Sequence, residues 1–305
     1  MTARIHTKVL VAVVMAAGLM LATQSAQAVV PGVNGKIFFA SAQDGNEEIY
    51  SMNPDGSEQK RLTFNTAFDF DPAISPDSTK VAFFSDRSGD EDIWVMNADG
   101  SGAPQLLTTN PEFDVQPSWS PDGTKIVFTS AVNGKQDIYV MNADGSGTPS
   151  PLTSDPAGLN VDEQRPVFSP DGAKIAFQRR AGNESDIWVM NADGSGATPL
   201  TANRFFESDP AWSPSGKQIA FAAIRKGDMD IYKMNANGSH KARLTAKGGS
   251  DFEPAYSPDG KKIAFAKERG GNRDVYVIKA DGSHQKRLTS DPAFDQLPGW
   301  GVSRQ

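Results

Sequence analysis

One sequence pattern recurs six times along the chain and limits the folds that are available to it. A complete copy reads Pro117-Ser-Trp119-Ser-Pro121-Asp-Gly123, Ile126-Val-Phe128, Asp137-Ile-Tyr-Val-Met-Asn142-Ala-Asp144-Gly145 and Leu152-Thr153. The residue that opens its second turn recurs at intervals of 44, 45, 49, 44 and 44 residues, at Asn53, Asn97, Asn142, Asn191, Asn235 and Lys279. A repeat of this length is typical of propellers and arrays, in which each unit buries its hydrophobic face against the next.

Each repeat is predicted to form four short strands and no helix. Segments such as Ile126–Phe128 and Asp137–Met141 are rich in β-branched and aromatic residues, and turn residues bound them. Ser120–Gly123 suits a tight turn, because its proline fixes φ and its glycine accepts a positive φ, and Asn142–Gly145 suits the next turn. The pattern therefore predicts an all-β fold of four-stranded antiparallel units.

One strand of each unit contains a proline, which cannot donate a hydrogen bond to a neighbouring strand and so belongs at a sheet edge. The six copies are Pro72, Pro117, Pro166, Pro210, Pro254 and Pro298. We assign this strand to the inner edge, because a hairpin leads from it into the aromatic middle of the unit. Two residues after each proline stands a bulky side chain that can fill the space between units: Ile74, Trp119, Phe168, Trp212, Tyr256 or Trp300.

The two ends of the pattern complement each other. The first copy begins in mid-motif at Gly35–Phe39 without a proline strand, and the last copy supplies only that strand, Asp295–Trp300. Pairing of the two ends would complete one unit, whereas an open array would need polar caps. The sequence therefore predicts a single domain, residues 29–305, that forms a six-bladed β-propeller whose ring is closed by pairing N- and C-terminal strands.

Residues 1–28 have the features of a cleaved secretory signal peptide. Arg4 and Lys8 form the basic end, Val9–Ala22 the apolar run, and Ala26–Ala28 the cleavage site. The alternative is a membrane anchor, but 14 apolar residues fall short of the ~20 that a spanning helix needs. We therefore expect a periplasmic or secreted protein, a monomer with no membrane insertion.

The mature chain is acidic and contains no cysteine. The net charge is −7, and cleavage after Ala28 removes two positive charges, which gives −9. Such a charge disfavours binding to nucleic acid or to anionic membranes. The lack of cysteine excludes disulfides and thiol catalysis.

An acidic residue stands three positions before each proline. The six are Asp69, Asp114, Glu163, Glu207, Asp251 and Asp295. Repetition of the strand predicts a ring of carboxylates at one end of the central channel, to which Asp71, Asp209 and Glu253 add negative charge. Three interpretations remain open: the acids fix the preceding loops through backbone hydrogen bonds, they attract a basic segment of a partner, or they bind calcium through oxygen ligands.

A phenylalanine precedes four of these acids. Phe68, Phe113, Phe206 and Phe294 either form an apolar collar at the channel mouth, as in an interface hot spot, or pack between blades as core, which we favour. Ser-x-x-Lys occurs at Ser57–Lys60 and Ser283–Lys286, but both follow a hairpin turn and do not open a helix, so a nucleophilic role is not expected. No hydrolase, zinc-binding or nucleotide-binding motif occurs, and His240 and His284 are expected to be exposed turn residues. We therefore expect no catalytic residues and no certain cofactor.

The repeated motifs resemble a known family. Pro-x-Trp-Ser-Pro-Asp-Gly at residues 117–123, followed by Asp-Ile-Tyr-Val-Met-Asn-x-Asp-Gly at residues 137–145, resembles the WD-like β-propeller repeat of the TolB type. The resemblance covers Gly35 to Trp300, without the α/β domain that precedes the propeller in TolB-type proteins. It implies an exported propeller that binds a protein partner at one face of the ring.

Two functions follow as hypotheses. The first is a non-catalytic protein-interaction module of the cell envelope or exterior, which binds a protein or peptide at the acidic mouth of the central channel. The alternative is a secreted carbohydrate-active or hydrolytic enzyme on a propeller scaffold, because one fold hosts many functions.

Overall fold

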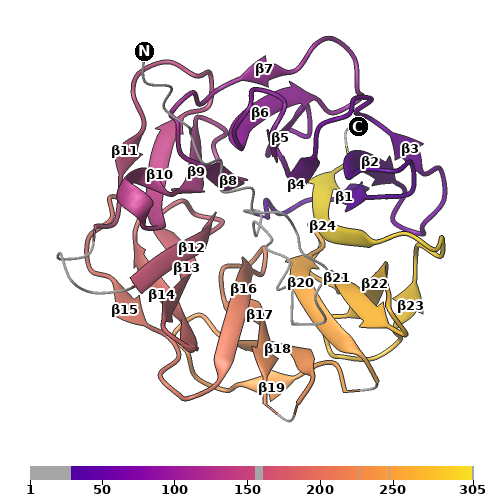
Figure 1. The fold of residues 1–305 in the computed structure, drawn as a ribbon. Helices are drawn as coiled ribbons and strands as arrows, with labels where there is room; N and C mark the ends of the chain where they lie inside the picture. Colours follow the sequence, from indigo (N-terminus) through magenta and orange to yellow (C-terminus); the bar gives the residue numbers. More distant parts are fainter. Residues whose placement is uncertain (1–28, 155–160, 226, 247, 304–305) are drawn as a thin grey trace, which may run out of the picture.

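The chain folds into antiparallel sheets that are arranged around a central axis, as Figure 1 shows. The computed structural model describes residues 29–154, 161–225, 227–246 and 248–303. The predicted signal peptide, residues 1–28, lies outside the described residues. In the described part, the only helical element is a 3-10 turn, η1 (Val132–Gly134), and no helix is long and apolar enough to cross a membrane. The all-β prediction is confirmed.

Four strand positions recur along the chain. The innermost strands, which contain the prolines, are β4 (Asp69–Ile74), β8 (Asp114–Trp119), β12 (Val161–Phe168), β16 (Phe206–Trp212), β20 (Ser250–Tyr256) and β24 (Asp295–Val302). The second strands are β1 (Asn34–Ser41), β5 (Lys80–Ser85), β9 (Lys125–Ser130), β13 (Lys174–Ala181), β17 (Gln218–Ile224) and β21 (Lys262–Arg269). The third strands are β2 (Glu48–Met52), β6 (Asp92–Asn97), β10 (Asp137–Asn142), β14 (Glu184–Asn191), β18 (Met229–Asn235) and β22 (Asn272–Lys279). The outermost strands have two residues each: β3 (Lys60–Arg61), β7 (Gln105–Leu106), β11 (Ser150–Pro151), β15 (Thr198–Pro199), β19 (Ala242–Arg243) and β23 (Lys286–Arg287).

These strands form five hydrogen-bonded sheets. Four sheets have four strands, in the orders β24-β1-β2-β3, β4-β5-β6-β7, β11-β10-β9-β8 and β20-β21-β22-β23. The fifth contains β12 to β19, and its two halves meet only at the parallel pair Ser185 and Phe206. Five of the six proline strands lie at an edge of their sheet, as the edge assignment predicts. The sixth, β16, has only the single parallel pair with β14 on its other side.

The C-terminal strand completes the sheet that begins at the N-terminus. β24 pairs antiparallel with β1, from Asn34 opposite Val302 to Ser41 opposite Asp295. A Cβ atom at Gly35 would lie 2.7 Å from the backbone of Val302, so the close approach of the two ends requires glycine there. The pairing of the terminal strands was correctly predicted. We call β24-β1-β2-β3 the closing sheet, after the ring closure that the sequence predicts.

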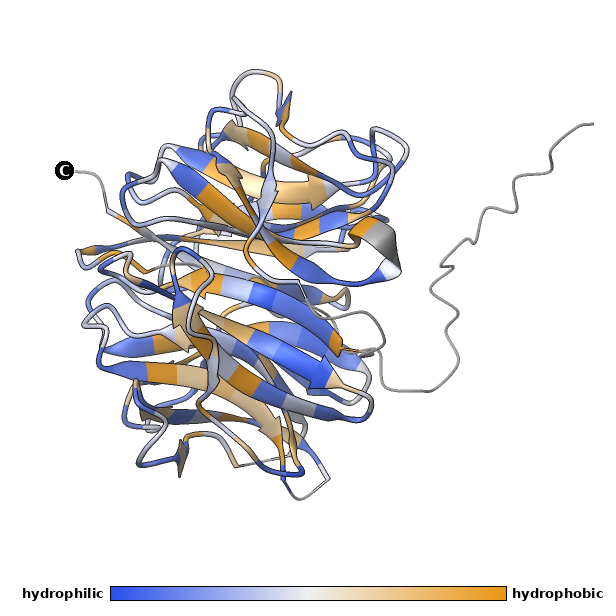
Figure 2. Ribbon diagram, turned by 90° about the vertical axis from the view of Figure 1, so that its left-hand side faces the viewer, coloured by the Kyte–Doolittle hydropathy of each residue, from blue (hydrophilic) through white to orange (hydrophobic). Residues whose placement is uncertain are grey.

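The core lies within and between the sheets. The repeated phenylalanines of the second strands are 0–1% exposed: Phe39, Phe83, Phe128, Phe177, Phe221 and Phe265. Trp300 in β24 packs against Ala255 and Val275 of the next sheet, which confirms that the bulky residue after the proline fills the space between units. In Figure 2, hydrophobic residues concentrate on the strands and hydrophilic residues on the loops at both ends.

Candidate functional site

The six acids that precede the prolines lie at the starts of the innermost strands, inside the protein. Each is 0–3% exposed: Asp69, Asp114, Glu163, Glu207, Asp251 and Asp295. Because all six strands start at the same end of the sheets, the acids share that end. We call them the strand-start acids. They lie beneath that face of the molecule rather than on it.

Four of these acids are neutralised by a basic side chain of their own sheet. Arg87 approaches Asp69 to 2.6 Å, Arg225 approaches Glu207 to 2.6 Å and Lys267 approaches Asp251 to 2.7 Å. Arg179 lies 3.6 Å from Glu163. The cations come from the second strand or the loop just after it, two or four residues after the repeated phenylalanine. This basic position is a sequence signal that the motif analysis missed.

An asparagine four residues earlier holds the acid in three units. The Asn65 amide donates to Asp69 at 2.7 Å, the Asn203 amide donates to Glu207 at 3.0 Å, and Asn110 donates to Asp114. These contacts tie each acid to the loop that enters its strand. The loop-fixing interpretation of the acids is therefore favoured, but with side-chain amides and cations as partners in place of the expected backbone groups.

Asp114 and Asp295 have no basic partner among the described residues. Burial raises the pKa of Asp114 to about 6, against opposing hydrogen bonds from Ser130, Thr108 and Asn110. Burial also raises the pKa of Asp295 to about 8, and the nearby Asp291 carboxyl adds to this rise. Desolvation disfavours the charged form of a carboxyl when no cation compensates it.

The raised pKa of Asp295 predicts a pH-dependent stability. The folded pKa lies above that of the unfolded chain, so this contribution to stability is full below pH ~4 and is lost as the pH rises through about 8. Asp295→Asn, which keeps the neutral form, should lose less stability than the wild type between pH 5 and 9. Melting temperatures of both proteins across that range test this, and parallel curves would contradict it.

The residue directly before each proline adopts a left-handed backbone conformation. Its φ lies between 52° and 61° at Asp71, Gln116, Arg165, Asp209, Glu253 and Leu297. The register of each innermost strand shifts at this point, so each carries a β-bulge. The bulge interrupts the two-residue alternation of a regular strand between the strand-start acid and the residue before the proline, as between Asp69 and Asp71. We call these six the axial residues.

The axial residues contact one another from different sheets. The Arg165 N–H donates to Oε1 of Gln116 at 3.0 Å, and the Leu297 N–H donates to Oε2 of Glu253 at 2.8 Å. Arg165 is 3% exposed and forms an ion pair with Asp209. Burial lowers the pKa of Arg165 to about 10, while Glu253 and Asp71, from β20 and β4, oppose this shift. One guanidinium therefore acts on carboxylates of three other innermost strands.

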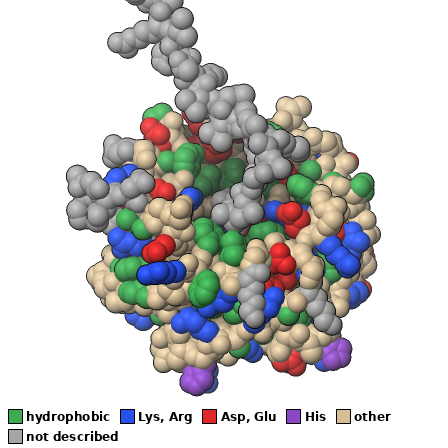
Figure 3. Space-filling model, turned by 60° about the horizontal axis from the view of Figure 1, so that its bottom comes forward, with side chains coloured by type: hydrophobic (Ala, Val, Ile, Leu, Met, Phe, Trp, Pro, Cys, Tyr) green, Lys and Arg blue, Asp and Glu red, His purple; other side chains and the backbone are tan. Residues whose placement is uncertain are grey.

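The phenylalanines beside the strand-start acids differ in burial. Phe68 is 53% exposed and Phe294 38% exposed, so the favoured assignment to the core is wrong for these two, whereas Phe113 is half-buried and the half-buried Phe206 packs against a core cluster. Phe64 and Phe205, which the sequence analysis missed, are 73% and 38% exposed on loops at the same end. In Figure 3, hydrophobic side chains lie around the middle of the visible face, with charged side chains among them.

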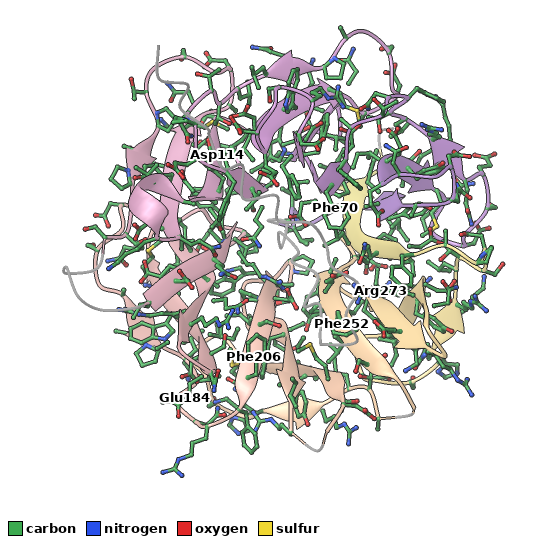
Figure 4. The ribbon with its side chains drawn as sticks, viewed as in Figure 1. Phe70, Asp114, Glu184, Phe206, Phe252 and Arg273 are labelled. Carbon is green, nitrogen blue, oxygen red and sulfur yellow. The ribbon has the colours of Figure 1, made fainter. Side chains whose placement is uncertain are left out.

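Arginines lie over several of these rings. The guanidinium of Arg61 lies 4.9 Å from the Phe64 ring centroid, and that of Arg225 lies 4.7 Å from Phe205. Arg273 lies 4.7 Å from Phe252 and 5.8 Å from Phe294, and Figure 4 shows Arg273 and Phe252 near the inner ends of their sheet. Each arginine also forms an ion pair with an acid, so the rings are held by groups that are themselves fixed.

The geometry provides no ready metal centre in the described part of the chain. No three His, Asp or Glu side chains gather there closely enough to hold an ion. The calcium site stays a prediction, and the four strand-start acids that are paired with a basic side chain would have to leave that partner to contribute. His240 and His284 are exposed at turns, as expected.

The repeated four-stranded antiparallel units around one axis define a β-propeller architecture. A family model described as the TolB beta propeller domain matches residues 5–106, 88–163 and 153–253, which together span well over half of the chain. The chain belongs to this TolB β-propeller family.

Solved structures with the same fold are distant in sequence. TolB from Acinetobacter baumannii is 23% identical, with a TM-score of 0.77 over 90% of this chain and 68% of that chain. A putative TolB from Agrobacterium tumefaciens is 22% identical, with a TM-score of 0.69 over 87% and 91%. Hydrazine synthase from Kuenenia stuttgartiensis is 19% identical, with a TM-score of 0.73 over 89% and 47%. At sequence identities below 25%, the similarity to these structures concerns the fold alone. A comparison with curated protein sequences finds no match.

Proposed function

We propose that this protein is a non-catalytic interaction module of the cell envelope or exterior, which binds a partner protein at the face where the innermost strands start. The proposal includes a six-bladed ring, which is supported by the six repeated units, with the two halves of the eight-stranded sheet counted separately, and by the pairing of β24 with β1. The predicted signal peptide supports export. The observation that carries the proposal is the set of exposed phenylalanines at that face: Phe64, Phe68, Phe205 and Phe294.

All four of these phenylalanines lie in loops that lead into an innermost strand. Apart from these four, the only large hydrophobic side chain exposed in the described part is Val33. Phe68 and Phe294 directly precede β4 and β24, which contact each other, so these two rings lie at neighbouring blades. Aromatic residues that are rimmed by charge are typical of the central part of protein interfaces. The strand-start acids are buried, so they hold the loops that carry these phenylalanines and do not themselves contact the partner.

Capture of the partner tests the function. Residues 29–305 serve as bait in the native envelope and secreted fractions, and the variant Phe64→Ser, Phe68→Ser, Phe294→Ser is compared with Val33→Ser as the matched control. We expect the triple variant to keep its melting temperature and to bind the captured protein at least about tenfold more weakly. Equal binding by both variants, or turnover of an envelope polymer by the purified protein, would argue against the proposal.

A further inference from the structure

The side chains around the strand-start acid of the closing sheet, Asp295, differ from those around Asp69 in the neighbouring sheet. Beside Asp69, an amide from Asn65 and a guanidinium from Arg87 both donate hydrogen bonds. In the closing sheet, Asp291 occupies the position of that asparagine, and Gln43 occupies the position of that arginine. Both donors are therefore replaced in one unit, and the amide is replaced by a second acid.

The backbone around these positions is unchanged. Oδ1 of Asn65 accepts the Ala67 N–H at 2.7 Å, and Oδ1 of Asp291 accepts the Ala293 N–H at 3.0 Å. At the other position, the Arg87 N–H donates to Ser85 Oγ at 3.3 Å, and the corresponding Gln43 N–H donates to Ser41 Oγ at the same distance. The closing sheet thus keeps the frame that positions the donors but lacks the donors themselves.

The result is a buried carboxyl without its usual partners. Asp295 is 0% exposed, and neither of its oxygens accepts a hydrogen bond of good geometry from the described residues, although the uncharged hydroxyls of Ser41 and Thr289 lie near enough to lower its pKa. Asp114 also lacks a cation, but it retains the Asn110 amide, so among the strand-start acids whose surroundings are described only Asp295 has lost both donors. Asp291 is half-buried, which leaves an approach to the pair from outside. Arg287 attracts Asp291 but forms its ion pair with Asp274, so within the described part of the chain the two carboxyls still lack a cation that contacts them directly and can accept one.

We propose that Asp291 and Asp295 form a binding site for a lysine or arginine side chain of the partner protein, which takes the place that Arg87 fills beside Asp69. Phe294, exposed between these two residues in the sequence, provides an apolar surface for the stem of that side chain. A metal ion fits less well, because the described residues offer no group of three acidic or imidazole ligands. That the cation comes from a protein rests on the proposed function, whereas the site itself can be tested without the partner.

The test uses methylguanidinium chloride as the probe and tetramethylammonium chloride, which cannot donate hydrogen bonds, as the salt control. We expect a saturable rise of a few degrees in the melting temperature of the wild type, together with a change in the carboxyl 13C shift of Asp295. Gln43→Arg, which supplies the cation within the chain, and Asp291→Asn should both remove this response. Arg87→Gln should create a second response, at Asp69.

Several outcomes would overturn the proposal. They are the absence of a saturable response in the wild type, an equal response in Gln43→Arg, and a larger response to calcium chloride, which would identify a metal site instead. A positive result together with failed partner capture would leave the cation site established and reject the proposed function. Capture that depends on the phenylalanines but is unaffected by Gln43→Arg would reject the cation site as part of the interface.

Discussion

Removal of residues 294–305 is expected to abolish most of the thermal stability of this protein. The deletion removes β24, leaves β1 as an open edge and empties the positions of Leu297 and Trp300, which are 0% and 1% exposed. Loss of one buried tryptophan alone costs about 3–5 kcal/mol. Because 1 kcal/mol shifts the melting temperature of a chain of this size by roughly 2–4 °C, we expect a fall of more than about 10 °C.

Two further variants separate the causes of this loss. Deletion of residues 304–305 should leave the melting temperature unchanged and controls for the length of the chain. Trp300→Ala removes the packing but keeps β24, so the difference between this variant and the long deletion measures the contribution of strand pairing. A long deletion that melts like the wild type would show that the terminal strands do not close the ring.

Replacement of Arg165 should have the second-largest effect. Arg165→Met keeps the side-chain volume but removes the guanidinium that faces Asp209 and influences Asp71 and Glu253, all at most 1% exposed. Removal of one partner of a buried ion pair typically costs about 3–5 kcal/mol, because the other charge remains buried without compensation. Chemical denaturation of the variant and the wild type at neutral pH measures the loss of unfolding free energy.

The pH dependence of this variant provides an independent check. Burial already raises the pKa of Glu253 in the wild type, and Arg165 opposes the rise. Without Arg165 the folded pKa of Glu253 rises further, so the variant should regain stability relative to the wild type as the pH falls. Adding Asp209→Asn should recover part of the loss. A variant as stable as the wild type, with no pH effect, would show that Arg165 does not compensate these acids.

Much of the fold could be predicted because it depends on residues that lie close together within each repeat. Each proline marks an edge strand, each repeated phenylalanine lies in the middle of a unit, and the incomplete motifs at Gly35 and Trp300 predict the pairing of β1 with β24. These conclusions need only the spacing of turn, β-branched and proline residues, which acts over a few positions. The position of the strand-start acids at one end of the sheets follows from the same spacing.

Whether each of those acids is paired with a basic side chain could not be predicted in this way. Whether a carboxyl is paired depends on a cation 16 or 18 residues away, which the antiparallel register brings beside it, as Lys267 is brought to Asp251 and Arg87 to Asp69. The bulge before each proline, which interrupts the alternation of a regular strand, has no signature in the strand pattern. The exposure of Phe68 and Phe294 likewise depends on how their loops pack over the sheet ends.

The sequence by itself therefore determined the repeated all-β units, the inner proline strand and the pairing of the two ends, because these depend on local conformational preferences and on periodicity. Only the tertiary structure decided that the acids are buried and mostly neutralised, that Arg165 serves acids from three other innermost strands, and that Asp295 lacks both of its usual donors. Burial and charge compensation are properties of the groups that surround a side chain in space. Those groups come from residues far apart in the sequence and are brought together only when the sheets assemble around the axis.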